Sequence, residues 1–145
     1  MEKKKIWLTF DDGPRQTQTD TVLDTLARSD IKATFFIVGS LVAKHGERIR
    51  RILGEGHRIG NHTYDHLRLV GQDKDTIIDQ IKRTEQALAP FQAPDPIMRP
   101  PYGAHDALVD RTIADLGYRQ VLWSVDTLDW KSDYREGGWV AHGVE

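Results

Sequence analysis

Two adjacent carboxylates, Asp11 and Asp12, follow the apolar run Ile6–Phe10 and precede Gly13-Pro14. The apolar run predicts a buried strand, and the Gly-Pro pair makes the chain leave that strand at once. Both carboxylates are therefore expected where a strand ends, and in α/β folds ligands and catalytic groups collect at that end of the sheet. One aspartate could bind a metal ion while the other acts on water. Taken alone, such a pair is more often a turn, because aspartate accepts bonds from nearby backbone N–H groups.

Two histidines, His62 and His66, stand four positions apart in the segment Gly60–His66. In a helical turn this spacing would place both imidazoles on one face. Zinc binds imidazole nitrogen at about 2.0–2.1 Å and carboxylate oxygen at a similar distance, so a distant aspartate could complete one site with open positions for water and substrate. The alternative is that His62 caps a turn and His66 is a solvated loop residue.

Two further segments could position polar groups. In Met98–Gly103 two prolines and a glycine restrict the backbone around Arg99 and Tyr102. An arginine beside a carboxylate favours the ionised form of the carboxylate, which suits a general base. The segment Trp123–Trp130 is an apolar run that ends in acidic and aromatic residues. Taken singly, the first segment is a proline-rich turn and the second is a strand with an ordinary polar exit.

Together these segments resemble the polysaccharide deacetylase family, also called the NodB-homology family or carbohydrate esterase family 4. The signatures T-F-D-D-G-P, H-[ST]-x-x-H, R-P-P-Y-G and D-x-x-D-W stand, in the family's order, at Thr9–Pro14, His62–His66, Arg99–Gly103 and Asp126–Trp130. The resemblance extends from about Ile6 to Lys131.

The resemblance implies a metal site and a general base at the matched positions. Asp12, His62 and His66 would hold a divalent metal ion, zinc by first preference, with cobalt or another divalent ion as alternatives. Asp11 would be the general base, and Arg99 would orient it. This arrangement is chemically coherent, because a bound metal ion polarises a carbonyl group and activates water while a carboxylate takes the proton of that water.

The resemblance also implies the residues that meet the substrate. Tyr102 would contribute its backbone N–H to an oxyanion hole, with Pro100 beside it, and Trp130 would form an apolar wall against the sugar. Asp126 would pair with the catalytic general acid. The implied reaction removes N-acetyl groups from N-acetylglucosamine units of peptidoglycan or chitin oligomers. The alternative is hydrolysis of O-acetyl esters on xylan, which some family members perform.

The family's fifth motif has no convincing counterpart in this chain. It is an apolar run that ends in Leu-x-His, and its histidine is the general acid; the nearest candidate in Lys131–Glu145 is His142, which lacks the preceding strand pattern. A second hypothesis is therefore a metal- and sugar-binding fragment with little turnover.

Alternating strand and helix patterns predict an α/β fold with a parallel sheet. The expected strands are Lys5–Phe10, Ala33–Val38, His57–Gly60, Ile97–Met98 and Arg119–Val125, and the expected helices are Thr17–Ser29, Leu41–Glu55, Asp75–Ala89 and His105–Leu116. The family fold is a distorted (β/α)7 barrel, of which about five βα units are visible. Residues 1–145 are therefore interpreted as one partial catalytic domain, truncated at its C-terminus, with an open sheet edge through which the chain could self-associate.

Composition narrows the classes of partner. The 20 Lys and Arg residues against 22 Asp and Glu residues give a formal net charge of −2, which shows neither a nucleic-acid footprint nor a polybasic membrane patch. No apolar stretch is long enough to span a bilayer. The expected partner is an acetylated oligo- or polysaccharide. Because such substrates lie outside the cell, an extracellular or cell-wall location is favoured, although the sequence shows no signal peptide.

Overall fold

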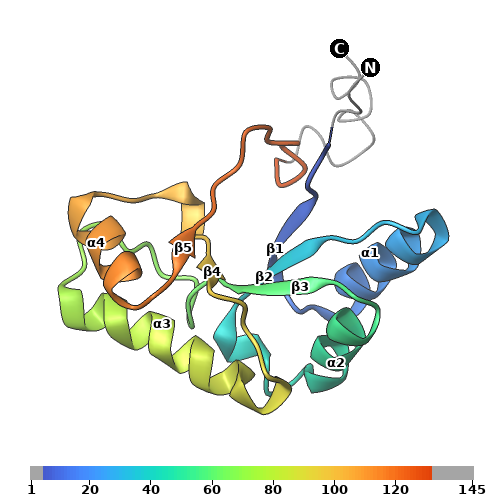
Figure 1. Cartoon of the computed structure of the whole chain (residues 1–145), viewed down its shortest axis with the longest axis horizontal. Coiled ribbons are helices and arrows are strands. Elements are labelled where there is room, and N and C mark those ends of the chain that lie inside the picture. The colour runs from blue at the N-terminus through green and yellow to red at the C-terminus, as the bar shows by residue number, and fades with distance from the viewer. Residues whose placement is uncertain (1–4, 132–145) are drawn as a thin grey trace.

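The computed structural model describes residues 5–131, which form one parallel sheet with helices packed against it (Figure 1). Its five strands lie in the order β1-β2-β3-β4-β5. Their bounds are β1 (Thr9–Gly13), β2 (Thr34–Ile37), β3 (Arg58–Asn61), β4 (Ile97–Met98) and β5 (Arg119–Gln120). Because each strand pairs with the next one in sequence, the sheet winds in one direction, as part of a barrel does. The predicted α/β fold with about five βα units is confirmed.

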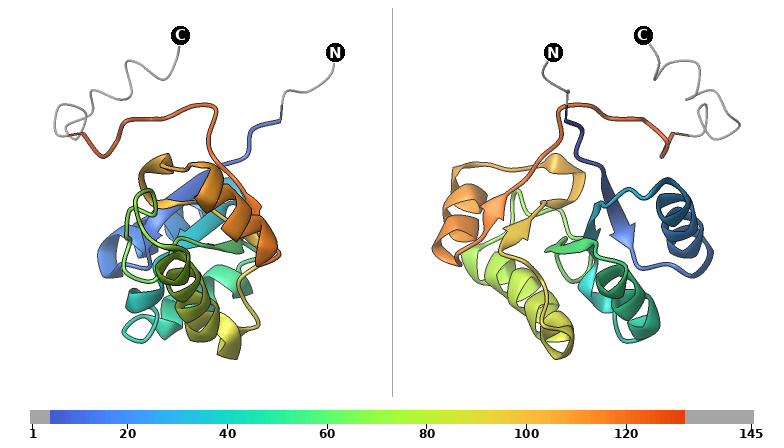
Figure 2. Two further views of the ribbon diagram at one scale, coloured as in Figure 1. Left: turned by 90° about the vertical axis from the view of Figure 1, so that its left-hand side faces the viewer. Right: turned by 45° about the vertical axis from the view of Figure 1, so that its right-hand side comes forward.

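Four α-helices connect the strands and lie outside the curved sheet (Figure 2). Their bounds are α1 (Gln16–Ser29), α2 (Gly46–Gly54), α3 (Lys74–Leu88) and α4 (Ala107–Asp115), with short 3₁₀ turns at η1 (Gly39–Leu41), η2 (Ala89–Phe91) and η3 (Pro101–Gly103). The helix expected from Leu41 begins instead at Gly46, because η1 occupies the residues that follow β2. Among the described residues, no helix is long and apolar enough to cross a membrane.

The core forms two clusters, one on each side of the strand β3–β4 junction. The first packs α1 and α2 against β2, with Ile49 and Ile52 fully buried. The second packs α3 and α4 against β4, with Ile77 and Ile81 fully buried. Both isoleucine pairs have helical spacing, which turns one face of each helix inward. Each such side chain contributes about 1.5–3 kcal/mol to stability, and these contacts fix the strand ends that carry the polar residues.

Strand β1 differs from the prediction at both ends. The apolar residues Ile6–Leu8 precede the strand and are exposed, with Ile6 at 85%. The strand begins at Thr9 and continues through both aspartates to Gly13. Its register with β2 shifts between Phe10 and Gly13, and Asp12 has a positive φ of 69°. A bulge of this kind re-aims the side chains of an edge strand, so the aspartates lie within the end of β1 and not beyond it.

Candidate metal centre

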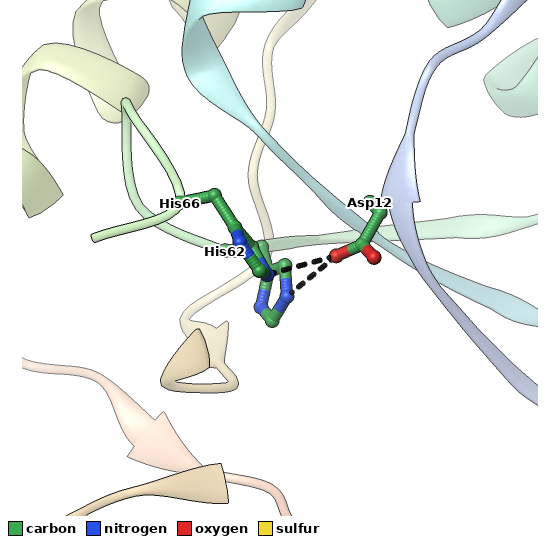
Figure 3. Close-up of side chains that lie close together, drawn as sticks. All are labelled: Asp12, His62 and His66. Atoms are coloured by element: carbon green, nitrogen blue, oxygen red, sulfur yellow. Dashed lines mark ion pairs between the residues drawn. The ribbon is translucent and has the colours of Figure 1, made fainter. Parts of the chain in front are cut away.

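One carboxylate and two imidazoles converge at the carboxyl ends of β1 and β3. Asp12 Oδ1 lies 3.2 Å from His62 Nε2 and 3.1 Å from His66 Nε2. The three candidate ligand atoms lie within 4.8 Å of one another, and Figure 3 shows the two rings facing the carboxylate. Segments about fifty residues apart in sequence thus supply a compact set of nitrogen and oxygen donors, the set that zinc prefers.

The two histidines reach this position from an irregular loop, and the proposed helical turn is wrong. The loop follows β3 directly and has no helical residue between Asn61 and Lys74. Thr63 and His66 have positive φ values of 67° and 57°. These two backbone conformations, and not helical spacing, bring the imidazoles together; their ring centroids lie 5.1 Å apart.

The hydrogen bond at the far side of His62 fixes its tautomer. Its side chain is 2% exposed, and Nδ1 lies 2.6 Å from the carbonyl oxygen of Arg99. Since a carbonyl oxygen only accepts, Nδ1 carries the hydrogen, and the neutral ring presents a lone pair at Nε2. That lone pair faces Asp12 Oδ1, which is also an acceptor. Two acceptors at 3.2 Å are compatible only with a shared proton or cation, so this donor set fits a divalent metal ion.

The charge of Asp12 agrees with that fit. With a proton shared between the carboxylate and the imidazole nitrogens, hydrogen bonding to His62, and next to His66, holds the pKa of this carboxyl well below its usual range, while partial burial opposes the shift. Asp12 is therefore ionised across the neutral pH range, as a metal ligand must be.

Asp11 lies beside this set but faces a different partner. Its Oδ1 accepts a hydrogen bond from Arg99 Nη1 at 2.8 Å, and the same nitrogen donates to Thr9 Oγ1 at 2.9 Å. Adjacent residues in the bulged end of β1 thus point to separate groups. Asp12 faces the histidines, and Asp11 is held by an arginine.

Arg99 is itself held on every side. It is 3% exposed, donates to the carbonyl oxygens of Val121 at 3.0 Å and Leu122 at 3.1 Å, and lies over the Phe36 ring at 4.4 Å from the centroid. Neither carbonyl partner was predicted from the sequence. No side-chain pattern could have revealed them, because the acceptors are backbone atoms of the segment after β5.

The loop after β4 places Tyr102 against the histidine pair. Tyr102 has a φ of 64°, and its ring centroid lies 4.9 Å from that of His66. Pro100 is buried, which fixes the backbone before this residue. At Gly103 a Cβ atom would lie 2.6 Å from the Trp123 ring, so the close approach of that indole requires glycine.

Asp126 and Trp130 lie on a separate exposed turn in the segment after β5, which leaves the sheet (Figure 1). Asp126 Oδ1 accepts from the N–H of Leu128 at 2.9 Å, and Asp126 Oδ2 lies 3.5 Å from Trp130 Nε1. The structure brings these two residues together, as the spacing of the D-x-x-D-W motif suggests, but in a group of their own. His142 lies outside the described residues.

A comparison with known protein families identifies the family of this chain. The family model described as polysaccharide deacetylase matches residues 1–121. The chain belongs to the polysaccharide deacetylase family. The resemblance inferred from the four motifs is confirmed.

Characterised members of the family are similar to most of this chain. It is 44% identical over 143 residues to the peptidoglycan-N-acetylglucosamine deacetylase PgdA of Listeria monocytogenes, an alignment that covers 97% of this chain and 29% of that protein. It is 40% identical over 132 residues to the chitooligosaccharide deacetylase of Rhizobium leguminosarum bv. trifolii, covering 89% of this chain and 60% of that protein. The chain thus spans less than two thirds of the length of these relatives.

Solved structures agree with the fold. The chitin deacetylase of the fungal pathogen Colletotrichum lindemuthianum superposes with a TM-score of 0.85 at 30% identity, over 96% of this chain and 66% of that one. The peptidoglycan deacetylase PdaC of Bacillus subtilis superposes with the same TM-score at 31% identity, over 96% of this chain and 69% of that one.

Proposed function

We propose that residues 1–145 form one partial catalytic domain of a metal-dependent hydrolase that removes N-acetyl groups from N-acetylglucosamine units. The single observation that carries this proposal is the convergence of Asp12, His62 and His66, with a second carboxylate, Asp11, held next to them by an arginine. Peptidoglycan and chitin oligomers are the substrate classes, since the relatives are named for peptidoglycan and chitooligosaccharide deacetylation.

Asp12, His62 and His66 would hold the ion, with zinc the first choice and cobalt or another divalent ion as alternatives. When bound, it would polarise the acetyl carbonyl and lower the pKa of a water molecule. His62 is oriented for this role by the bond from its Nδ1 to the Arg99 carbonyl, which keeps Nε2 available.

Asp11 would accept the proton of the attacking water. Its carboxylate is partly exposed, so water can reach it, while its other side is fixed by Arg99. A base with one preferred orientation serves proton transfer better than a freely rotating one.

The remaining roles concern the substrate. Tyr102 lies against His66, and its backbone N–H would donate to the developing oxyanion beside the buried Pro100. Trp130 would offer an apolar wall to the sugar, and Asp126 would orient the general acid that protonates the leaving amine.

Acetate release tests the proposal. Purified protein with added Zn²⁺ or Co²⁺ should release acetate from chitin oligomers or peptidoglycan, and Asp11→Asn should lower the rate by on the order of 10² or more. The second candidate, metal and saccharide binding with little turnover, predicts bound sugar without acetate. Release from acetylated xylan in place of amide substrates would support the esterase alternative. Equal acetate release by Asp11→Asn and the unmodified chain would contradict the proposed mechanism.

A further inference from the structure

The loop that carries both histidines has a backbone that its residues do not favour by themselves. Thr63 and His66 both have φ near +60°, at 67° and 57°. A positive φ is sterically unfavourable for any residue with a side chain, and most unfavourable for a β-branched residue such as threonine. The conformation that points both imidazoles at Asp12 must therefore be held by contacts from outside the loop.

Three hydrogen bonds to the backbone of Thr63 and Tyr64 hold the start of the loop. The N–H of Thr63 donates to Asn61 Oδ1 at 2.9 Å, and its carbonyl accepts from the N–H of Gly39 at 2.9 Å. The carbonyl of Tyr64 accepts from the N–H of Ser40, also at 2.9 Å. The bonds from Gly39 and Ser40 join the loop to η1, and the bond to Asn61 joins it to the end of β3. The N–H groups in the middle of the loop must find acceptors elsewhere.

One side chain of α3 satisfies that middle part. Gln80 is 5% exposed, and its Oε1 accepts from the N–H of Tyr64 at 3.1 Å and of Asp65 at 2.9 Å. Its Nε2 donates to Asp65 Oδ2 at 2.8 Å. The orientation of the carboxamide follows from chemistry, because N–H groups need an acceptor and a carboxylate needs a donor. Gln80 thus fills three hydrogen-bonding positions between the two histidines.

We propose that Gln80 is a positioning residue of the metal site, an inference that rests on the proposed function. It touches neither ligand. It acts through the backbone of Tyr64 and Asp65, and sets the distance at which His62 and His66 face Asp12. A residue at this position must combine an acceptor for two N–H groups with a donor for a carboxylate, and a carboxamide does both.

Metal affinity and the visible absorption spectrum of bound Co²⁺ test this role without any assay of turnover. Gln80→Met keeps the volume of the side chain and removes its hydrogen bonds. In protein shown to be folded by circular dichroism, this change should weaken Co²⁺ binding about 10-fold, the lower end of the loss seen when a residue that hydrogen-bonds a metal ligand directly is removed, and should shift the spectrum. Gln86→Met is the matched control, because Gln86 is exposed on the same helix; its Co²⁺ affinity should equal that of the unmodified chain.

A second test exchanges the hydrogen-bond donor on Gln80 and the acceptor on Asp65. Gln80→Glu places a carboxylate against Asp65 and should weaken Co²⁺ binding. The pair Gln80→Glu with Asp65→Asn restores one donor and one acceptor between the two side chains and should recover affinity to within about threefold of the unmodified chain. If Gln80→Met fails to fold, this pair decides the question.

The outcomes distinguish failure of the proposed metal site from failure of the positioning role of Gln80 alone. An unmodified chain that binds no Co²⁺ overturns the proposed metal site, and the role of Gln80 with it. An unmodified chain that binds Co²⁺, with Gln80→Met of equal affinity and spectrum, overturns only the positioning role. Equal affinity of Gln80→Glu and the double variant overturns it as well.

Discussion

His62 Nδ1 donates to the backbone carbonyl of Arg99 at 2.6 Å, so the most buried of the three candidate metal ligands is hydrogen-bonded to the residue that holds Asp11. The side chain of Arg99 reaches the other way, to Asp11. Arg99, in the loop after β4, therefore fixes the tautomer of His62 with its backbone and the position of the Asp11 carboxylate with its side chain. Arg99 thus couples the orientation of His62 to the position of Asp11.

Substitution of Arg99 should lower stability as well as activity. Arg99→Lys retains one charge but loses the bonds to the Val121 and Leu122 carbonyls, which would then be unsatisfied. The free energy of unfolding should fall by on the order of 3 kcal/mol. Urea denaturation measures this change.

The matched control for this prediction is Arg58→Lys. Arg58 pairs with Asp95 at 2.7 Å, but both side chains are exposed. Its replacement should change the free energy of unfolding by less than about 1 kcal/mol. Losses of similar size in the two variants would show that Arg99 has no special structural role.

His57 should make stability fall in mild acid. Its ring is buried, and burial, with Lys32 next in importance, lowers its pKa below the ordinary 6.5. Nδ1 also accepts from the N–H of Ala33 at 3.1 Å, which requires the neutral ring. As pH falls below about 6.5, the unfolded chain binds a proton that the folded chain does not. The free energy of unfolding therefore decreases until the pH reaches the lowered pKa of the folded state.

His57→Asn tests this sign. The asparagine carbonyl can still accept from Ala33, but it does not titrate, so the decrease between neutral pH and pH 5 should become smaller. His105→Asn is the control, since His105 is a more exposed histidine paired with Asp110; the acid-dependent loss should persist in that variant. Urea titrations at a series of pH values give both slopes. An unchanged slope in His57→Asn would refute the assignment.

A methyl group at position 39 should disturb the packing behind the histidine loop. In Gly39→Ala the added Cβ would lie 2.5 Å from Thr84 Oγ1 and 2.7 Å from Tyr64 Cδ2. Overpacking of this kind costs about 1–3 kcal/mol. In Gly54→Ala nothing lies within 4 Å of the new atom, and the helical position should gain up to about 1 kcal/mol. Thermal denaturation should thus shift the two variants in opposite directions; a fall in both midpoints would contradict this interpretation.

The uncovered sheet edges should support self-association. Within residues 5–131, β1 pairs only with β2 and β5 only with β4, and apolar side chains such as Ile6 (85% exposed) and Val125 (79%) lie next to these edges. Sedimentation velocity should show association that increases with concentration and decreases in Ile6→Lys/Val125→Lys. Leu108→Lys on α4 should not reduce it. A monomer at every concentration would contradict this prediction.

Much of the fold was predictable because local patterns and the tertiary structure agree. Helical spacing places Ile77 and Ile81 on one face of α3, and both are fully buried. The exposed run Ile6–Leu8 was assigned wrongly, since apolar residues next to an edge strand carry the same pattern as a buried strand. The pattern of apolar residues in a sequence shows which segments could be buried. It does not show whether a neighbouring strand is present to bury them.

The candidate site was predictable in its residues but not in its geometry. The motifs identified His62 and His66, yet a spacing of four residues suggested a helix where the structure has a loop with positive φ values. Gln80 carries no motif signal, because a buried glutamine on an amphipathic helix has no distinctive spacing. Its role follows only from the hydrogen bonds that tertiary structure creates.

The two neighbouring aspartates should have different roles in metal binding, and calorimetric titration with Zn²⁺ distinguishes them. The unmodified chain should bind one ion, Asp12→Ala should lose most of that affinity, and Asp11→Asn should retain it, because only Asp12 faces the two imidazoles. Asp24→Asn, an exposed aspartate on α1, should bind as the unmodified chain does. Full affinity in Asp12→Ala, or an equal loss in both aspartate variants, would show that the two residues do not divide metal binding and proton transfer between them.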